Sequence, residues 1–170
     1  MIVLFAAGVV ALDVGIIVAL MALFSRPWRR TVTLWCEKYG ILALFLFASI
    51  SVAATLWMQY DANLAPCIFC WWQRICMYPI VLITFIALIK GARMPDIADY
   101  ILGLSLLGAL IALYQHLLQL LPSGSLIPCD ASDDCAIRSV FEFHFVTLPW
   151  MAFTVFFAIA LIAILARGRR

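Results

Sequence analysis

Charged residues are scarce in this sequence of 170 residues, in which Asp, Glu, Lys and Arg make up 12% and the apolar set AVILMFWYC makes up 67%. Soluble domains carry about 25% charged and roughly 45–50% apolar residues, so a soluble globular domain is excluded. Disordered and fibrous chains are excluded as well, and a net charge of +2 gives no support for a polyanionic partner such as nucleic acid. The composition indicates a single membrane domain.

Several patterns are also missing. Alternating apolar and polar residues, which mark β-strands, do not occur, and there is no internal repeat or low-complexity segment. The chain has no glycine-rich dinucleotide fingerprint, and Trp71 rather than a histidine follows Cys70, so it lacks a haem attachment motif. These absences predict an all-α protein without a bound soluble redox cofactor.

The apolar residues form five runs of the length that crosses a membrane, about 20 residues at 1.5 Å each. The first run is expected to stay as a helix and not to be removed as a signal peptide, since no Lys or Arg precedes it and no small-residue cleavage site follows. Pro79 and Pro149 fall inside predicted helices and are expected to kink them. The five predicted spans are 2–24, 39–58, 71–89, 100–121 and 145–166.

Basic residues predict the orientation, because Lys and Arg accumulate in cytoplasmic loops. In a five-span arrangement, one side receives nine of the eleven basic residues. The amino terminus and the second and fourth connections are therefore expected outside the cytoplasm, and the carboxyl terminus inside. The nine residues are Arg26, Arg29, Arg30, Lys38, Lys90, Arg93, Arg167, Arg169 and Arg170.

Two close cysteine pairs fall on the predicted exterior side. This side of a bacterial membrane is the compartment where disulfides form and persist. A pair spaced Cys-x-x-Cys is typical of redox sites and of zinc sites, so both interpretations are open. The pair in the acidic loop is either an exchangeable disulfide or a structural one. The pairs are Cys67 with Cys70 and Cys129 with Cys135.

Arg74 favours the redox interpretation of the first pair. Cys67, Cys70 and Arg74 follow an i, i+3, i+7 spacing, which places them on one face of a helix. The amino end of that helix and a nearby permanent cation would both stabilise a thiolate. The alternative is an interfacial arginine that extends to lipid headgroups.

The segment 66–79, PCIFCWWQRICMYP, resembles the Cys-x-x-Cys segment of the DsbB family of membrane disulfide-forming proteins, and its BdbC-like members most closely. The segment 114–122, YQHLLQLLP, resembles the end of that family's next helix. The likeness covers roughly residues 39–170 and implies a four-helix thiol oxidoreductase domain. Residues 1–38 are then an extra transmembrane helix followed by a basic cytoplasmic loop.

The resemblance implies a path for electrons. A reduced, exported thioredoxin-like (DsbA-like) protein attacks the Cys129–Cys135 disulfide at Cys129, and exchange through Cys135 and Cys67 passes the electron pair to Cys67 and Cys70. Cys70 then faces the final acceptor. A quinone dissolved in the bacterial inner membrane, ubiquinone or menaquinone, is the carrier left by elimination, and the family implies the same.

The quinone site is expected around Arg74 and His116. Arg74 would hold one quinone carbonyl, and His116 lies at a depth similar to that of Cys70. Gln73 and Gln119 are weaker candidates. The alternative for His116 is an interfacial side chain that meets headgroups.

The sequence assigns no functional role to three further residues with reactive or charged side chains. Cys36 and Cys76 are expected to pack as small apolar side chains. Asp13 lies in the first predicted span, where a carboxylate is costly, and it is not assigned.

Three alternatives to a quinone-dependent thiol oxidase are open. A vitamin K epoxide reductase-like enzyme shares the helices and the cysteine pattern, although the residues around Arg74 and Met77 fit it less well. A non-catalytic protein could bind metal through the four exterior thiols. A structural scaffold with disulfide-bonded loops would not respond to quinone.

Overall fold

The computed structural model describes residues 2–63, 66–120, 141–142 and 146–167. Its helices are all long and apolar enough to cross a membrane, which confirms the predicted all-α membrane bundle. In chain order the elements are α1 (Ile2–Leu23), α2 (Arg26–Tyr60), α3 (Ile68–Lys90), α4 (Met94–Leu120), β1 (Phe141–Glu142), β2 (Val146–Thr147) and α5 (Leu148–Arg167).

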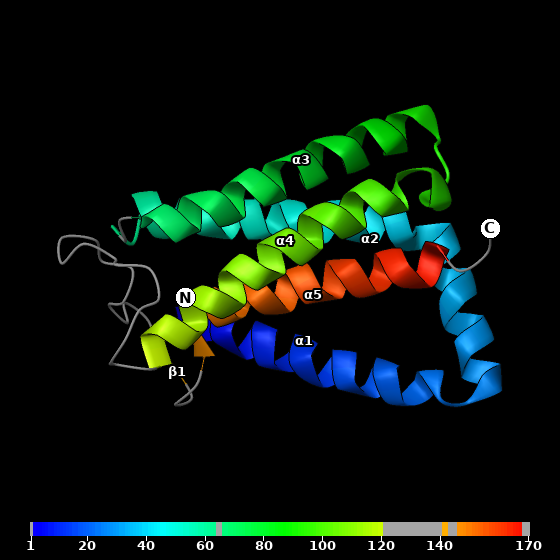
Figure 1. Ribbon diagram of the computed structural model, residues 1–170, viewed down its shortest axis with the longest axis horizontal. Coiled ribbons are helices and arrows are strands. Elements are labelled where there is room, and N and C mark those ends of the chain that lie inside the picture. The colour runs from blue at the N-terminus through cyan, green and yellow to red at the C-terminus, as the bar shows by residue number, and fades with distance from the viewer. Residues whose placement is uncertain (1, 64–65, 121–140, 143–145, 168–170) are drawn as a thin grey trace.

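Helix α2 is longer than the predicted second span. It runs for 35 residues and includes the basic segment that the sequence suggests as a connection. Ser25 is its N-cap, a proline stands in its first turn, and no proline or glycine follows until Gly40, so nothing interrupts the helix at residue 38. Figure 1 shows the first turns of α2 crossing one end of the bundle before the helix continues along it.

The start of α5 also differs from the prediction. Residues 141–142 and 146–147 form a short antiparallel ladder, contrary to the expected absence of strands. Strands of two residues are too short to leave an alternating pattern in a sequence. Because α5 begins at Leu148, Pro149 lies in its first turn, where no helical hydrogen bond is lost, and the expected kink there is wrong. Pro79 does lie inside α3.

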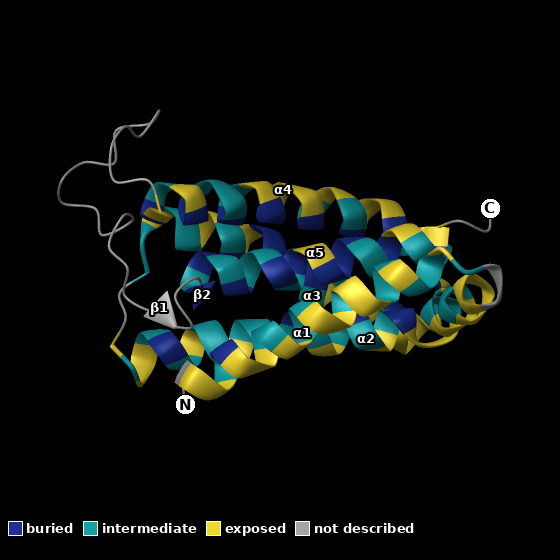
Figure 2. Cartoon of the chain, turned by 90° about the horizontal axis from the view of Figure 1, so that it is seen from below, coloured by how far each residue is buried: buried dark blue, intermediate teal, exposed yellow. Residues whose placement is uncertain are grey.

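The core lies between α4 and α5, which form the most extensive helix pair, with α2 and α3 packed beside them. Phe156 of α5 is 1% exposed and fits against Gly108 of α4, where a side chain would leave no room for the ring. Helix α1 packs mainly against α2 and α5, and nearly all of its described residues are exposed or half-buried (Figure 2).

The connections sort between the two ends of the bundle. The α1–α2 turn, the α3–α4 turn and the end of α5 gather at one end, on the right in Figure 1, and bring Lys90, Arg93 and Arg167 there. Arg167 pairs with Asp99 at 3.0 Å between Nε and Oδ1. The α2–α3 connection and the start of α5 lie at the opposite end. The basic segments therefore share one end, as the predicted orientation requires.

The contact between α4 and α5 gives a test of the packing. A methyl group added at Gly108 would lie 2.4 Å from ring atoms of the fully buried Phe156. We expect Gly108→Ala to lower the free energy of unfolding by about 1–3 kcal/mol, as overpacked cores do. Denaturant titration in detergent micelles measures this change.

Gly103→Ala is the matched control on the same helix, because nothing lies within 4 Å of a Cβ at Gly103. It should be neutral or stabilising by up to about 1 kcal/mol, since alanine favours the helix. Equal destabilisation by both variants would contradict the described packing.

Candidate functional site: a dithiol and an arginine in one cavity

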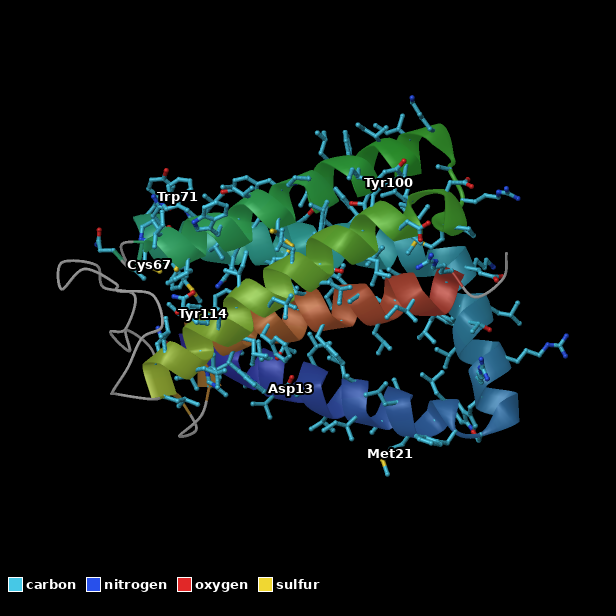
Figure 3. All side chains as sticks on the ribbon, in the orientation of Figure 1. Asp13, Met21, Cys67, Trp71, Tyr100 and Tyr114 are labelled. Atoms are coloured by element: carbon cyan, nitrogen blue, oxygen red, sulfur yellow. The ribbon has the colours of Figure 1, made fainter. Side chains whose placement is uncertain are left out.

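Cys67 and Cys70 lie together at the amino end of α3. Cys67 is the N-cap residue, and Cys70 is in the first turn, as the sequence predicts. Their sulfur atoms are 3.0 Å apart. Figure 3 shows Cys67 at the end of the bundle opposite the basic connections. The first N–H groups of a helix have no partner within it, so this position favours a thiolate.

Gln115 of α4 holds this thiol pair from the facing helix. Its Nε2 donates to Cys67 Sγ at 3.1 Å and reaches Cys70 Sγ at 3.8 Å. Gln73 Nε2 in turn donates to Gln115 Oε1 at 2.8 Å. Because the oxygen accepts this bond, the amide NH₂ is directed toward sulfur. Sequence reasoning gave Gln115 no role, although the residue lies in the segment 114–122 that resembles the family, one turn before Gln119.

Arg74 is buried beside the pair, with 7% of its surface exposed, so it does not extend to headgroups. Its guanidinium donates to Gln59 Oε1 and to the backbone carbonyl of Thr55, the latter at 3.2 Å. It also lies over the ring of Trp71, 5.2 Å from the centroid. Both hydrogen-bond acceptors are neutral.

The charge of Arg74 is not balanced by an acid in the described part of the chain. The ion pairs within 4.0 Å there are Arg93–Asp96 and Arg167–Asp99. A buried cation in a membrane bundle is costly unless an electron-rich group faces it. Two neutral oxygens and the Trp71 ring face the guanidinium, so a ligand oxygen or sulfur with negative charge meets no competing carboxylate among the described residues.

Cys67, Cys70 and Arg74 line one cavity of about 370 Å³, so the predicted common face is confirmed. This volume is within the range of small-molecule sites, roughly 300–1,000 Å³. One part of the lining is polar and the rest is apolar, with contributions from all five helices. The polar lining is Ser51, Thr55, Cys67, Cys70, Gln73, Arg74, Gln115 and Gln119.

His116 points elsewhere. Its Nδ1 lies 2.8 Å from Thr147 Oγ1, and its ring is 5.0 Å from that of Trp150. It is not among the residues that line the cavity. The weaker candidates Gln73 and Gln119 do line it, so the structure brings Arg74 and these amides to the thiols and leaves His116 apart. A role for His116 in quinone binding stays a prediction.

The remaining cysteines divide into two groups. Cys76 is buried in the hydrophobic core and Cys36 packs against it, which are the positions that a packing role requires. Cys129 and Cys135 lie outside the described residues. In the described part of the chain, no three His, Cys, Asp or Glu side chains come together as a metal site.

The geometry defines a membrane protein with a dithiol beside a buried cation, and comparison with known proteins identifies its family. The family described as "Disulfide bond formation protein DsbB" matches residues 37–167. The chain belongs to this family, and its role is that of a thiol–disulfide oxidoreductase in disulfide bond formation. No solved structure matches significantly.

Curated relatives carry the same description. The chain is 33% identical to "Disulfide bond formation protein C" of Bacillus subtilis, over 75% of this chain and 95% of the relative. It is 36% identical to "Probable disulfide formation protein C" of Halalkalibacterium halodurans, over 74% and 90%. It is 34% identical to "Probable disulfide formation protein" of Chlamydia trachomatis, over 76% and 93%. The resemblance to the BdbC-like members is confirmed.

The hydrogen bond from Gln115 to sulfur gives a test. We expect Gln115→Leu to slow alkylation of Cys67 in the reduced protein by about two- to tenfold, because a donor that stabilises the thiolate is lost. Iodoacetamide labelling at constant pH, read by mass spectrometry of the peptide that contains Cys67, measures the rate. Gln73→Leu should have a smaller effect because the direct donor remains. Equal effects, or none in either variant, would contradict this role for Gln115.

Proposed function

We propose that this protein is a thiol:quinone oxidoreductase that reoxidises an exported thioredoxin-like (DsbA-like) disulfide donor. The observation that carries the proposal is the shared cavity, in which the Cys67–Cys70 pair lies with a buried arginine that has no carboxylate partner in the described residues. An arginine so placed stabilises negative charge that develops on an acceptor oxygen, because few water dipoles compete with it there.

Electrons enter through the loop cysteines. The thiolate of the reduced partner attacks the Cys129–Cys135 disulfide at Cys129, and Cys135 leaves as a thiolate. When the partner's second thiol resolves the mixed disulfide, Cys129 and Cys135 are a dithiol and the partner carries a disulfide. The cysteine spacing and the family support this step.

The electron pair then passes from the loop cysteines to the cysteines in the cavity. Cys135 attacks Cys67, the Cys67–Cys70 bond breaks, and the electron pair of that bond goes to Cys70. Attack by Cys129 on Cys135 restores the loop disulfide and leaves Cys67 and Cys70 as a dithiol. Gln115 donates toward both sulfurs and so stabilises the thiolate that forms at either position.

A quinone supplies an acceptor for two electrons and two protons that is soluble in lipid. Cys70 would face it, and the dithiol would give up two electrons and two protons to it as the Cys67–Cys70 disulfide closes. Arg74, which Gln59 and the Thr55 carbonyl hold in place, would donate to one ring carbonyl. The residues present fit such a ligand, because the buried cation lacks an acidic partner in the described chain and the amides of Gln73 and Gln115 add polar contacts at the same end of the cavity.

The proposed setting is a bacterial inner membrane with the thiols on the exterior side. The basic connections at the opposite end of the bundle support a cytoplasmic position for that end. Residues 39–170 form the proposed oxidoreductase domain, and residues 1–38 add a helix and a basic segment. The amino terminus is then outside and the carboxyl terminus in the cytoplasm.

Cysteine variants test the electron path. With a reduced thioredoxin-like protein as donor, Cys67→Ala and Cys129→Ala should both abolish quinone reduction, since each removes a necessary sulfur. With dithiothreitol as donor, Cys129→Ala should retain activity and Cys67→Ala should not, because the small thiol reduces the inner pair directly. Anaerobic loss of quinone absorbance measures the rates.

Cys36→Ala is the matched control and should retain full activity with both donors, because its thiol packs against the core. Unchanged turnover in both Cys67→Ala and Cys129→Ala would refute the proposed path.

Arg74 variants test the acceptor site. Arg74→Gln should raise the KM for quinone by about ten- to a hundredfold, the effect of losing a charged hydrogen-bond donor. Arg74→Lys should lie between this variant and the unchanged protein because it keeps the charge but loses the planar guanidinium. Arg93→Gln, at the opposite end of the bundle, should leave the KM unchanged. A fall in kcat with constant KM in Arg74→Gln would instead indicate that Arg74 acts on the charge that develops during reduction and does not hold the bound quinone.

A further inference from the structure

Helix α1 contributes part of the cavity that holds the dithiol. Its side chains at positions 4, 5, 8, 9 and 12 line the cavity together with α2 and α5. The family match begins at residue 37, so α1 lies outside it. A segment outside the family domain therefore shapes the space beside the reactive thiols.

The cavity has two chemically different parts. The thiols, Arg74 and the glutamines form the polar part, whereas the side chains from α1 are Leu4, Phe5, Gly8, Val9 and Leu12. A ligand that fills both parts has a polar ring and an apolar tail. An isoprenoid quinone has this chemistry.

Asp13 fixes the position of α1. Its Oδ2 accepts a hydrogen bond from Trp150 Nε1 at 3.1 Å, and its Oδ1 accepts one from Thr154 Oγ1 at 2.8 Å. Asp13 is the one charged residue in α1, midway along the helix in Figure 3. Both bonds reach α5, so the carboxylate sets the rotation and height of α1 against that helix.

The rotation determines which α1 residues line the cavity. Val9 and Phe5 come four and eight residues before Asp13, about 40° and about 80° from it around the helix, so all three lie within one half of its circumference. Phe5 also contacts Trp57 of α2, with ring centroids 5.9 Å apart. Ala6 is fully buried and belongs to a cluster with Met58 and Met151. These contacts hold the amino half of α1 over the cavity.

We propose that α1 forms the tail-binding part of the quinone site, and that Asp13 is the positioning residue that holds it there. This inference rests on the proposed function for the identity of the ligand. The ring lies at Cys70 and Arg74, and the first part of the isoprenoid tail lies against α1. The extra helix thus gives the enzyme a preference for quinones with a tail.

Two glycines of α1 provide a matched test. Nothing lies within 4 Å of a Cβ at Gly8 or at Gly15, so both positions accept a side chain without a clash. Gly8 lines the cavity and Gly15 does not. Gly8→Leu fills the apolar part of the cavity, whereas Gly15→Leu changes the same helix outside it.

The measurement is the Kd of the oxidised protein for two probes, a benzoquinone without a tail and the same ring with two isoprene units. Oxidised protein cannot reduce either probe, so quenching of tryptophan fluorescence reports binding alone. Gly8→Leu should raise the Kd for the tailed quinone by about tenfold, because apolar tail surface stays unburied, and should affect the tailless quinone less. Gly15→Leu should change neither value.

Asp13 variants provide the second arm. Asp13→Leu should also raise the Kd for the tailed quinone, because α1 loses both hydrogen bonds to α5. Asp13→Asn keeps an acceptor oxygen and should restore most of the affinity. A comparable loss in both variants would show that the hydrogen bonds do not position α1.

An unchanged Kd for the tailed quinone in Gly8→Leu, or an equal change in Gly15→Leu, would overturn the inference. Loss of co-purified phospholipid in Gly8→Leu with unchanged quinone affinity would assign the cavity to a lipid chain and overturn it as well. Tail-dependent binding in a protein without thiol-dependent quinone reduction would support the tail site and contradict the proposed function. Absence of binding by either quinone would contradict both.

Discussion

Hydrocarbon offers no hydrogen bonds, so a polar group inside this bundle needs a partner within the protein, and the groups that build the site find theirs on other helices. Arg74 reaches from α3 to α2, where it meets an amide oxygen and a backbone carbonyl. Gln73 and Gln115 join α3 to α4 and end at the Cys67 sulfur. The contacts that position the reactive groups are also contacts that bring the helices together.

The same need for hydrogen-bond partners explains how α1 is held against the bundle. It packs mainly against α2 and α5, and its single carboxylate accepts two hydrogen bonds from α5. An unpartnered carboxylate in lipid would oppose insertion of the helix, whereas a partnered one fixes its rotation. The hydrogen bonds of Asp13 therefore hold an otherwise apolar helix in the position where it lines the cavity.

Much of this architecture could be predicted from the sequence. The lengths of the apolar runs predicted the five helices, because a membrane-spanning helix needs about 20 apolar residues. The spacing of Cys67, Cys70 and Arg74 predicted their shared face on α3, because residues three and four apart lie on one side of a helix. The long start of α2 could not be read from hydropathy, since a polar segment with no interior breaker continues a helix as readily as it ends one.

The direction in which each helix turns its side chains could not be predicted from the sequence. Gln115 and His116 are neighbours at similar depth, yet Gln115 faces the thiols and His116 faces Thr147 and Trp150. In an almost uniformly apolar helix, no amphipathic pattern distinguishes these two directions. The partners of Asp13 lie more than a hundred residues away in the chain, so the sequence offered no local signal for them.

The central claim is that the dithiol delivers its electrons to a quinone. Anaerobic mixing of the fully reduced protein with quinone, with absorbance and titratable thiols followed together, tests it most directly. The account predicts that one quinone is reduced for each thiol pair lost. Constant quinone absorbance with all thiols still titratable would contradict it.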